Sequence, residues 1–255
     1  MKNCLLVAKY SFREVIKSNI LFYVALLGVA CLGLILVAKE FTYQTTVRVT
    51  LDVGLGLLTV SCNIIAIFLG ANLVAKEVES RTVYMIISRP VSRSSFLIGK
   101  LLGLNTYLVV NTLVLSFLTL SAYFFSGGES QSLIYWNLLF IFMEASILLV
   151  LVALFSLITN VHLTVLFSIV LLGVGHAIED ALGAKFLQGA PLLKQFLEVA
   201  HWVLPAFYKL NIKDFVLYRH ELPWDYLIKH LAYGVMYMMA LVFLSVGIFN
   251  RKNLD

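Results

Sequence analysis

The sequence predicts an all-α integral membrane protein that forms a single domain over residues 1–255. Of the 255 residues, 61% are hydrophobic and only 13% are charged, and the mean hydropathy is +0.94. A soluble domain carries about 25% charged residues. Six stretches have the length and composition of membrane-spanning helices, which need about 20 apolar residues. Lys and Arg gather beside some ends of these stretches and avoid others, as membrane topology requires.

Residues 1–18 predict an amphipathic helix that lies along the inner leaflet before the first span. Its cations would lie near anionic lipid headgroups. The alternative is an ordinary cationic flank that only sets the orientation of the first span. The predicted helix has an apolar stripe, Leu5, Ala8, Phe12, Val15 and Ile16, beside a basic stripe, Lys2, Lys9, Arg13 and Lys17.

Each predicted span can satisfy its own backbone hydrogen bonds as a helix. The first span resembles a signal peptide because cations precede it, but it lacks a convincing small-residue cleavage site, so we expect it to be retained. The fifth span is short because it ends in the polar cluster of His176, Glu179 and Asp180. The six spans cover residues 19–37, 53–75, 96–125, 133–158, 163–178 and 228–249.

The distribution of Lys and Arg predicts that both chain ends are cytoplasmic. In that orientation the inner segments hold eleven Lys and Arg residues, while the two short outer loops hold only Lys39 and Arg48. Cations are enriched on the cytoplasmic side of short loops. Residues 75–100 would be cytoplasmic, and residues 39–50 and 182–225 would be outside. Because most cations in short loops are explained by topology, nucleic-acid binding is not expected.

The most charged segment, residues 76–95, lies between the second and third predicted spans. A helix can continue out of the second span over residues 76–87. Pro90 ends it, because Pro has no backbone N–H and the residue before Pro disfavours the helical conformation. Ser92 or Ser94 can then cap the third span. The segment would form a short helix, a rigid corner and a new helix, which together can transmit force.

Residues 181–228 predict short helices that lie on or dip into the outer leaflet. Pro191 opens an apolar pattern with helical spacing, and Pro205 closes it. A second amphipathic stretch follows, and Trp224 with Tyr226 marks the return to the membrane interface.

Glu144 is the only acidic residue near the centre of a predicted span. An ionisable side chain there is costly unless it is paired, which makes it a functional candidate. It could line a translocation path, take up a proton or hydrogen-bond another helix, and helix pairing is the favoured interpretation. Asn63, Asn105 and Asn111 are candidate partners.

His176, Glu179 and Asp180 share one helical face, which suits metal binding or proton transfer. Only two or three ligands lie together, so the favoured interpretation is a solvated helix end, and no metal site is expected. The Gly-Lys pair in FLIGKLLG lacks the other residues of a phosphate-binding loop, and no hydrolase motif is present. We therefore expect no enzyme activity, no catalytic residue and no cofactor in the chain itself.

The stretch VAKEVESRTVYMIISRPVSRSSFLIGKLLG resembles the intracellular segment of ABC-2 type transporter permeases. The shared features are an acidic helix, a Thr, an apolar run, a Pro-Val-Ser-Arg corner and a Gly-Lys restart. The six spans, the amphipathic N-terminal helix and the interfacial segment extend a looser resemblance over nearly the whole chain. One departure is Arg81, where many members carry Gly. The resemblance assigns ATPase coupling to Lys76, Glu77, Glu79, Arg81, Thr82, Met85, Ile86, Pro90 and Arg93.

The resemblance implies a half-transporter that moves a substrate, most often outward, across the inner membrane of a bacterial or archaeal cell. Two ATPase subunits would bind ATP and Mg, and a second permease copy would complete a homodimer. Membrane lipids and an extracytoplasmic accessory protein are further candidate partners. The alternatives are a mechanotransmitting or scaffold subunit that drives an extracytoplasmic partner, and a proton-coupled carrier. Glu144, Asn63 and Asn111 are candidates for a pathway or for helix pairing.

Overall fold

The computed structural model describes residues 2–17, 26, 28–30, 33–35, 37, 46–79, 92–183 and 191–251. These residues form helices and no strand, which confirms the predicted all-α class. In chain order the helices are α1 (Lys2–Lys17), α3 (Thr46–Glu79), α5 (Arg93–Phe125), α6 (Ser132–Ile158), α7 (Val161–Gly183), α8 (Pro191–Val203), the 3-10 helix η2 (Phe207–Leu210), α9 (Lys213–Leu217) and α10 (Trp224–Arg251).

Within the described residues, five helices are long and apolar enough to cross a membrane. They are α5, α6, α7, α10 and the part of α3 from Thr46 to Leu73, and each coincides with one of the last five predicted spans. In the first predicted span, residues 19–37, the described positions are helical. Most of that first span lies outside the described residues, so it stays a prediction.

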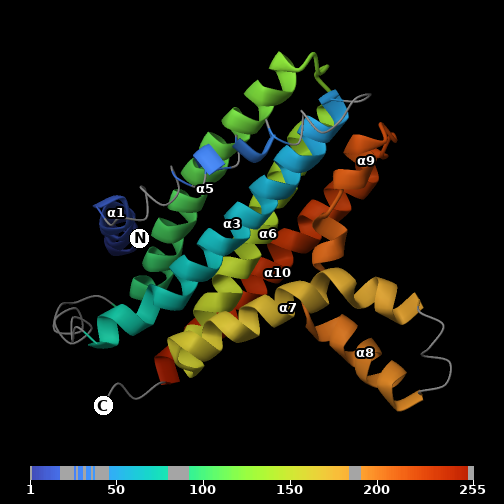
Figure 1. The fold of residues 1–255 in the computed structure, drawn as a ribbon. Coiled ribbons are helices and arrows are strands. Elements are labelled where there is room, and N and C mark those ends of the chain that lie inside the picture. The colour runs from blue at the N-terminus through green and yellow to red at the C-terminus, as the bar shows by residue number, and fades with distance from the viewer. Residues whose placement is uncertain are drawn as a thin grey trace.

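α6 is the central helix of the bundle and contacts α3, α5, α7 and α10 (Figure 1). Its sequence is apolar on nearly every side, as expected for a helix that others enclose. Gly70 brings α3 very close to it, because a Cβ atom on Gly70 would lie 2.9 Å from the carbonyl oxygen of Leu149 and 2.8 Å from Cβ of Val152. A small residue at this crossing is what allows the two backbones to approach.

α1 lies beside α5 (Figure 1), at the N-terminal position predicted for an amphipathic helix. Ser11 and Val15 face inward and are only 7% exposed. Leu5 and Ile16, which were predicted to share the lipid-facing stripe with Val15, stay exposed. The predicted stripe is thus divided, because α1 uses one of its sides to pack against protein rather than against lipid.

α7 extends to Gly183, beyond the predicted end of the fifth span at residue 178. The helix therefore continues through the polar cluster that was expected to end it. α7 and α8 form a helical hairpin that projects from the bundle in Figure 1. α8 ends just before Pro205, as predicted, because Pro cannot continue the helical hydrogen-bond ladder.

The connection from α8 to η2 is held by two tyrosines of α10. The Tyr233 hydroxyl accepts a hydrogen bond from the Ala206 N–H at 2.9 Å, and the Tyr237 hydroxyl donates one to the Val203 carbonyl oxygen at 2.9 Å. Phe207 is fully buried against Gly175 of α7. This connection therefore packs onto both α7 and α10.

α9 covers the end of the bundle at which α3 begins. Lys213 forms an ion pair with Asp52 of α3, with 2.5 Å between Nζ and Oδ1. Arg48 of α3 lies over the Tyr218 ring, 4.1 Å from its centre, in a cation–π contact. Arg219 forms a further ion pair with Glu129, which follows α5. Three contacts therefore fasten the segment around α9 to neighbouring helices.

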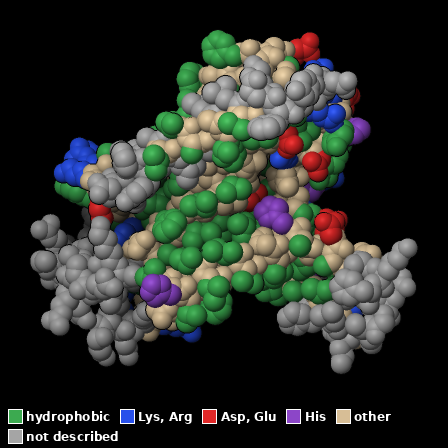
Figure 2. Space-filling model, in the orientation of Figure 1, with side chains coloured by type: hydrophobic (Ala, Val, Ile, Leu, Met, Phe, Trp, Pro, Cys, Tyr) green, Lys and Arg blue, Asp and Glu red, His purple; other side chains and the backbone are tan. Residues whose placement is uncertain are grey.

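Hydrophobic side chains cover much of the middle of the face seen in Figure 2, while charged side chains gather toward α1 and α9. Large exposed side chains on the long helices include Phe117, Val170 and Phe243. Soluble proteins seldom expose so much contiguous apolar surface. This distribution of side chains is typical of a helical bundle whose middle is covered by lipid.

Candidate functional site

The predicted ATPase-coupling segment begins at the end of α3. The backbone is helical through Lys76, Glu77 and Glu79, so the helix does continue out of the second predicted span. The remaining predicted coupling residues before Arg93 lie outside the described residues, and these are Arg81, Thr82, Met85, Ile86 and Pro90. α5 starts at Arg93 with Ser92 as its N-cap, because the Ser92 hydroxyl oxygen accepts a hydrogen bond from the Ser95 N–H at 3.3 Å.

The start of α5 is also bound to the end of α10. Asn250 donates a side-chain hydrogen bond to the Ser94 hydroxyl oxygen at 3.0 Å, and the rings of Phe96 and Phe249 stack with 6.3 Å between their centres. A displacement of the turn before α5 would therefore reach α10 as well. No sequence signal pointed to this link, because the two partners are separated by most of the chain.

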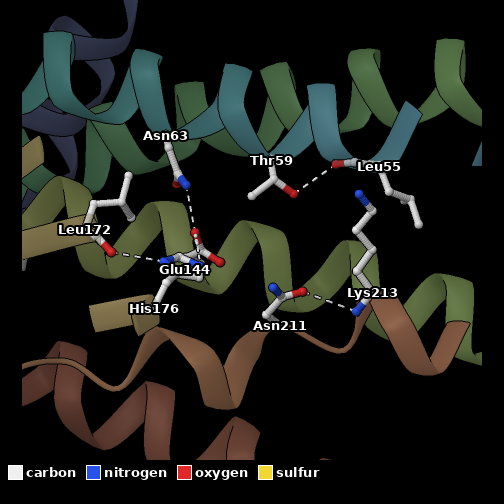
Figure 3. Close-up of polar contacts among 8 residues, drawn as sticks. All are labelled: Leu55, Thr59, Asn63, Glu144, Leu172, His176, Asn211 and Lys213. Atoms are coloured by element: carbon white, nitrogen blue, oxygen red, sulfur yellow. Dashed lines mark hydrogen bonds and ion pairs between the residues drawn. The ribbon is translucent and has the colours of Figure 1, made fainter. Parts of the chain in front are cut away.

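Glu144 of α6 lies in the interior of the bundle and is 2% exposed. Asn63 of α3 donates a hydrogen bond from Nδ2 to Glu144 Oε1 at 2.7 Å. Figure 3 shows Asn63 reaching the carboxylate from the α3 side. The acidic side chain of α6 therefore pairs with one of the three amides that the sequence offered.

The other two candidate amides lie elsewhere. Asn105 Oδ1 accepts a hydrogen bond from the Ser146 hydroxyl at 2.8 Å, so it joins α5 to α6. Asn111 is 3% exposed, and neither its Nδ2 nor its Oδ1 has a hydrogen-bond partner within the described part of the chain. Leaving a buried polar group unpaired costs about 1–3 kcal/mol. Asn111 therefore does not pair with Glu144 in the described part of the chain.

His176 of α7 reaches Glu144 from the opposite side to Asn63 (Figure 3). Its Nε2 lies 3.5 Å from Glu144 Oε1, and its Nδ1 lies 3.0 Å from the Leu172 carbonyl oxygen. The ring also stacks on Phe207, with 5.7 Å between the ring centres. The interpretation of His176 as part of a solvated helix end is therefore wrong, because α7 continues and turns this side chain toward α6.

Glu179 and Asp180 remain exposed one turn further along α7. They do not join His176 in a cluster, and no group of three metal-binding side chains occurs among the described residues. One signal in the sequence could have indicated that His176 contacts Glu144. The two residues are separated by nearly equal numbers of residues from the turn at Thr159 and Asn160, one before it and one after it. Two antiparallel helices would place such residues opposite one another.

A row of small or polar residues on α3 connects this site with the end of the bundle under α9. The row consists of Asp52, Gly56, Thr59 and Asn63, at i, i+4, i+7 and i+11 of one helix, spacings that repeat one helical face. Lys213 lies along it, since a Cβ atom on Gly56 would be 3.1 Å from Lys213 Nζ. Polar groups therefore extend from the Asp52–Lys213 ion pair toward Glu144.

Long apolar helices around a buried polar site are typical of a multi-pass membrane protein. The family model described as ABC-2 membrane transporter related matches residues 31–190, which is more than half of the chain. The chain belongs to this family, and the resemblance to ABC-2 permeases seen in the sequence is confirmed. Its members are permease-type transport components rather than ATPases. The comparison with curated proteins gave no match.

Proposed function

We propose that this chain is the transmembrane subunit of an ATP-binding cassette exporter, driven by ATP hydrolysis on a separate ATPase subunit. The observation that supports this most directly is the continuity of α3. One helix runs from Thr46 along the central helix α6 and on to Glu79, so its last residues belong to the predicted docking segment, residues 76–95. A continuous helix moves as a unit, so a push at one end of α3 would reach Asn63 and, through it, Glu144.

The proposed complex contains two copies of the ATPase and a second copy of this permease as a homodimer. ATP and Mg would bind to the ATPase subunits. The complex would lie in the inner membrane of a bacterial or archaeal cell, with both permease termini in the cytoplasm and with lipid around the bundle. An extracytoplasmic accessory protein is a further proposed partner.

The experiment measures ATPase retention and ATP-driven transport in the same membrane preparation. Met85→Asp or Ile86→Asp should abolish co-purification with the ATPase, because an apolar anchor must fill a cleft on the partner. Glu77→Ala and Arg81→Ala should weaken coupling moderately, because exposed charges tune orientation more than affinity. Pro90→Ala should keep binding but lower transport per ATP, because a softer corner transmits less motion.

Ser130→Asp is the matched control, since it adds the same charge to an exposed turn at the opposite end of α5. This variant should keep both ATPase retention and transport. If the coupling variants insert normally and all behave like Ser130→Asp, the segment is only a solvated loop and the proposal is rejected.

A proton-coupled carrier is the second candidate, favoured by the contact between Glu144 and His176. An ATPase-dead partner separates the two functions. Transport should stop with the dead partner if ATP drives the chain, and should persist in a proton gradient if the chain is a carrier.

A further inference from the structure

The hydrogen-bond partners of Glu144 and His176 indicate which atoms of the pair carry a proton. The Leu172 carbonyl oxygen can only accept a hydrogen bond, so the Nδ1 atom that lies 3.0 Å from it carries a hydrogen. The other ring nitrogen, Nε2, faces Glu144 Oε1 at 3.5 Å. If both facing atoms lacked a proton, a nitrogen lone pair would oppose a carboxylate oxygen in the protein interior.

The surroundings of Glu144 make that doubly deprotonated state costly. The side chain is 2% exposed, and a buried carboxylate needs partners to offset its lost hydration. Asn63 supplies one donor at 2.7 Å. A proton shared with His176 would supply the remaining stabilisation of Oε1, either as imidazolium with carboxylate or as neutral imidazole with carboxylic acid. Both arrangements are neutral overall and contain one proton between the two residues.

α7 buries few of its own side chains against the bundle. Its buried residues are only Thr164, Ser168, Gly175 and Ile178. Gly175 packs beneath Phe207 of η2, and Phe207 stacks on the His176 ring. α7 packs against α6, α3 and η2. His176 touches α6 through Glu144 and η2 through Phe207, so its protonation state affects two of these three attachments of the α7–α8 hairpin.

We propose that Glu144 and His176 form a binding site for a single proton, which holds the α7–α8 hairpin against α6. Removal of the proton breaks the N–H bond at His176 Nε2, or the O–H bond at Glu144, and passes the proton to water. The charge of the pair then changes from zero to minus one, and the facing atoms repel each other. The site is the same whether ATP or a proton gradient drives transport, because the proposal needs only the contact itself.

Other ionisable groups lie on the elements that pack against α6 and α7. Asn63 of α3 and Phe207 of η2 touch the pair but do not ionise. On α7, Glu179 and Asp180 are exposed one turn away. Burial, followed by the charge of Glu179, raises the pKa of the Tyr208 phenol in η2, so Tyr208 stays protonated at neutral pH. Ionisable side chains on the elements packed against α6 or α7 include Asp52 on α3, Lys100 on α5, His201 on α8, Lys209 on η2, Lys213 on α9 and His230 on α10.

The row from Asp52 to Asn63 places polar side chains between the pair and the end of the bundle under α9. Thr59 is part-buried and its hydroxyl donates to the Leu55 carbonyl oxygen at 2.9 Å (Figure 3). The His176 side chain is itself 31% exposed. The pair can thus exchange its proton without unfolding of α6.

The test uses the full chain, purified in lipid nanodiscs without ATPase, with spin labels on two exposed positions in a cysteine-free version. Phe117→Cys places one label on α5, and Val199→Cys places the other on α8, at side chains that are 71% and 63% exposed. The distance distribution between the labels is measured from about pH 5 to about pH 9, which spans the usual range of His titration. We expect a transition that involves about one proton, as for a tightly coupled pair.

Glu144→Gln should remove the transition. The two labels should then stay at the shorter distance, with the hairpin held against α6, at every pH, because a Gln amide can donate to a neutral His176 Nε2. Glu179→Gln is the matched control on the same helical face of α7 and should keep the transition. If Glu144→Gln does not fold, His176→Gln provides the same comparison from the more exposed side. A wild-type protein without a transition, or a transition that survives in either Gln variant of the pair, overturns the proposal. ATP-driven transport plays no part in this readout, so failure here leaves the proposed exporter function standing.

Discussion

Gly103 of α5 lies so close to Ala8 of α1 that a Cβ atom on Gly103 would stand 2.5 Å from the Ala8 carbonyl oxygen. One turn earlier, a Cβ atom on Gly99 would stand 2.6 Å from the Cys4 carbonyl oxygen. Two glycines four residues apart therefore form the surface on which α1 rests, in the manner of small-residue helix crossings. The Gly-Lys-Leu-Leu-Gly sequence that lacks the rest of a phosphate-binding loop has this packing role instead.

We predict that Gly103→Leu displaces α1, because the atoms in the way include backbone that cannot rotate aside. Overpacking of this kind costs about 1–3 kcal/mol. In a cysteine-free version with Ser11→Cys, the thiol should react with a maleimide faster than in the parent, because Ser11 is 7% exposed. Gly173→Leu is the control, since no atom lies within 4 Å of a Cβ atom there. Equal labelling rates in the two Leu variants would show that the glycine does not seat α1.

The hydrogen bond between Asn63 and Glu144 predicts that the stability changes of the two single variants do not add in a double-mutant cycle. Glu144→Leu leaves the Asn63 amide without its acceptor and should cost about 1–3 kcal/mol of stability. Glu144→Gln keeps an acceptor oxygen and should cost less. The double variant with Asn63→Leu and Glu144→Leu should recover part of the loss, because replacing both partners removes the orphaned polar group. Thermal unfolding in detergent measures the wild type, Asn63→Leu, Glu144→Leu, the double variant and Glu144→Gln. Wild-type stability and transport for Glu144→Leu would remove any special role for this carboxylate.

The ion pair of Asp52 and Lys213 predicts that α9 can be cross-linked to α3. In a cysteine-free version, Asp52→Cys combined with Lys213→Cys should join through a short bifunctional thiol reagent. Replacing Lys213 with Ala alone should change stability by less than about 1 kcal/mol, because both side chains are partly exposed and such pairs contribute little. Asp52→Cys combined with Lys194→Cys on α8 is the control for random collision. If this control pair reacts as fast as the first, α9 does not cap α3 in the membrane.

The charge distribution predicts membrane orientation, which labelling from each side of the membrane can measure. A single cysteine at Gln44 should react with an impermeant reagent only from outside, and one at Ser88 only from the cytoplasm. Both residues lie outside the described part of the chain, so the prediction depends on the cation count alone. Labelling of both positions from the same side would contradict it.

Local chemistry made much of the architecture predictable from the amino-acid order. A helix satisfies its backbone hydrogen bonds within a single segment, so apolar length alone predicted α3, α5, α6, α7 and α10. Pro205 and Ser92 act on their immediate neighbours. The end of α8 was therefore predicted correctly, and the cap of α5 is one of the two serines that were predicted. The resemblance to ABC-2 permeases also rested on a local pattern, and the family match agrees with it.

The sites where helices meet depended on the tertiary structure, because the contact of two side chains far apart in the chain is set by how the helices rotate and cross. Glu144 was recognisable as a buried acid, but its second partner, His176, was taken for a helix end because apolar length alone could not show that α7 continues to Gly183. The role of Gly99 and Gly103 was hidden for the same reason, since a missing side chain has meaning only once another backbone lies against it. Amino-acid order specified the helices, and the packing of those helices in three dimensions assembled the polar site between them.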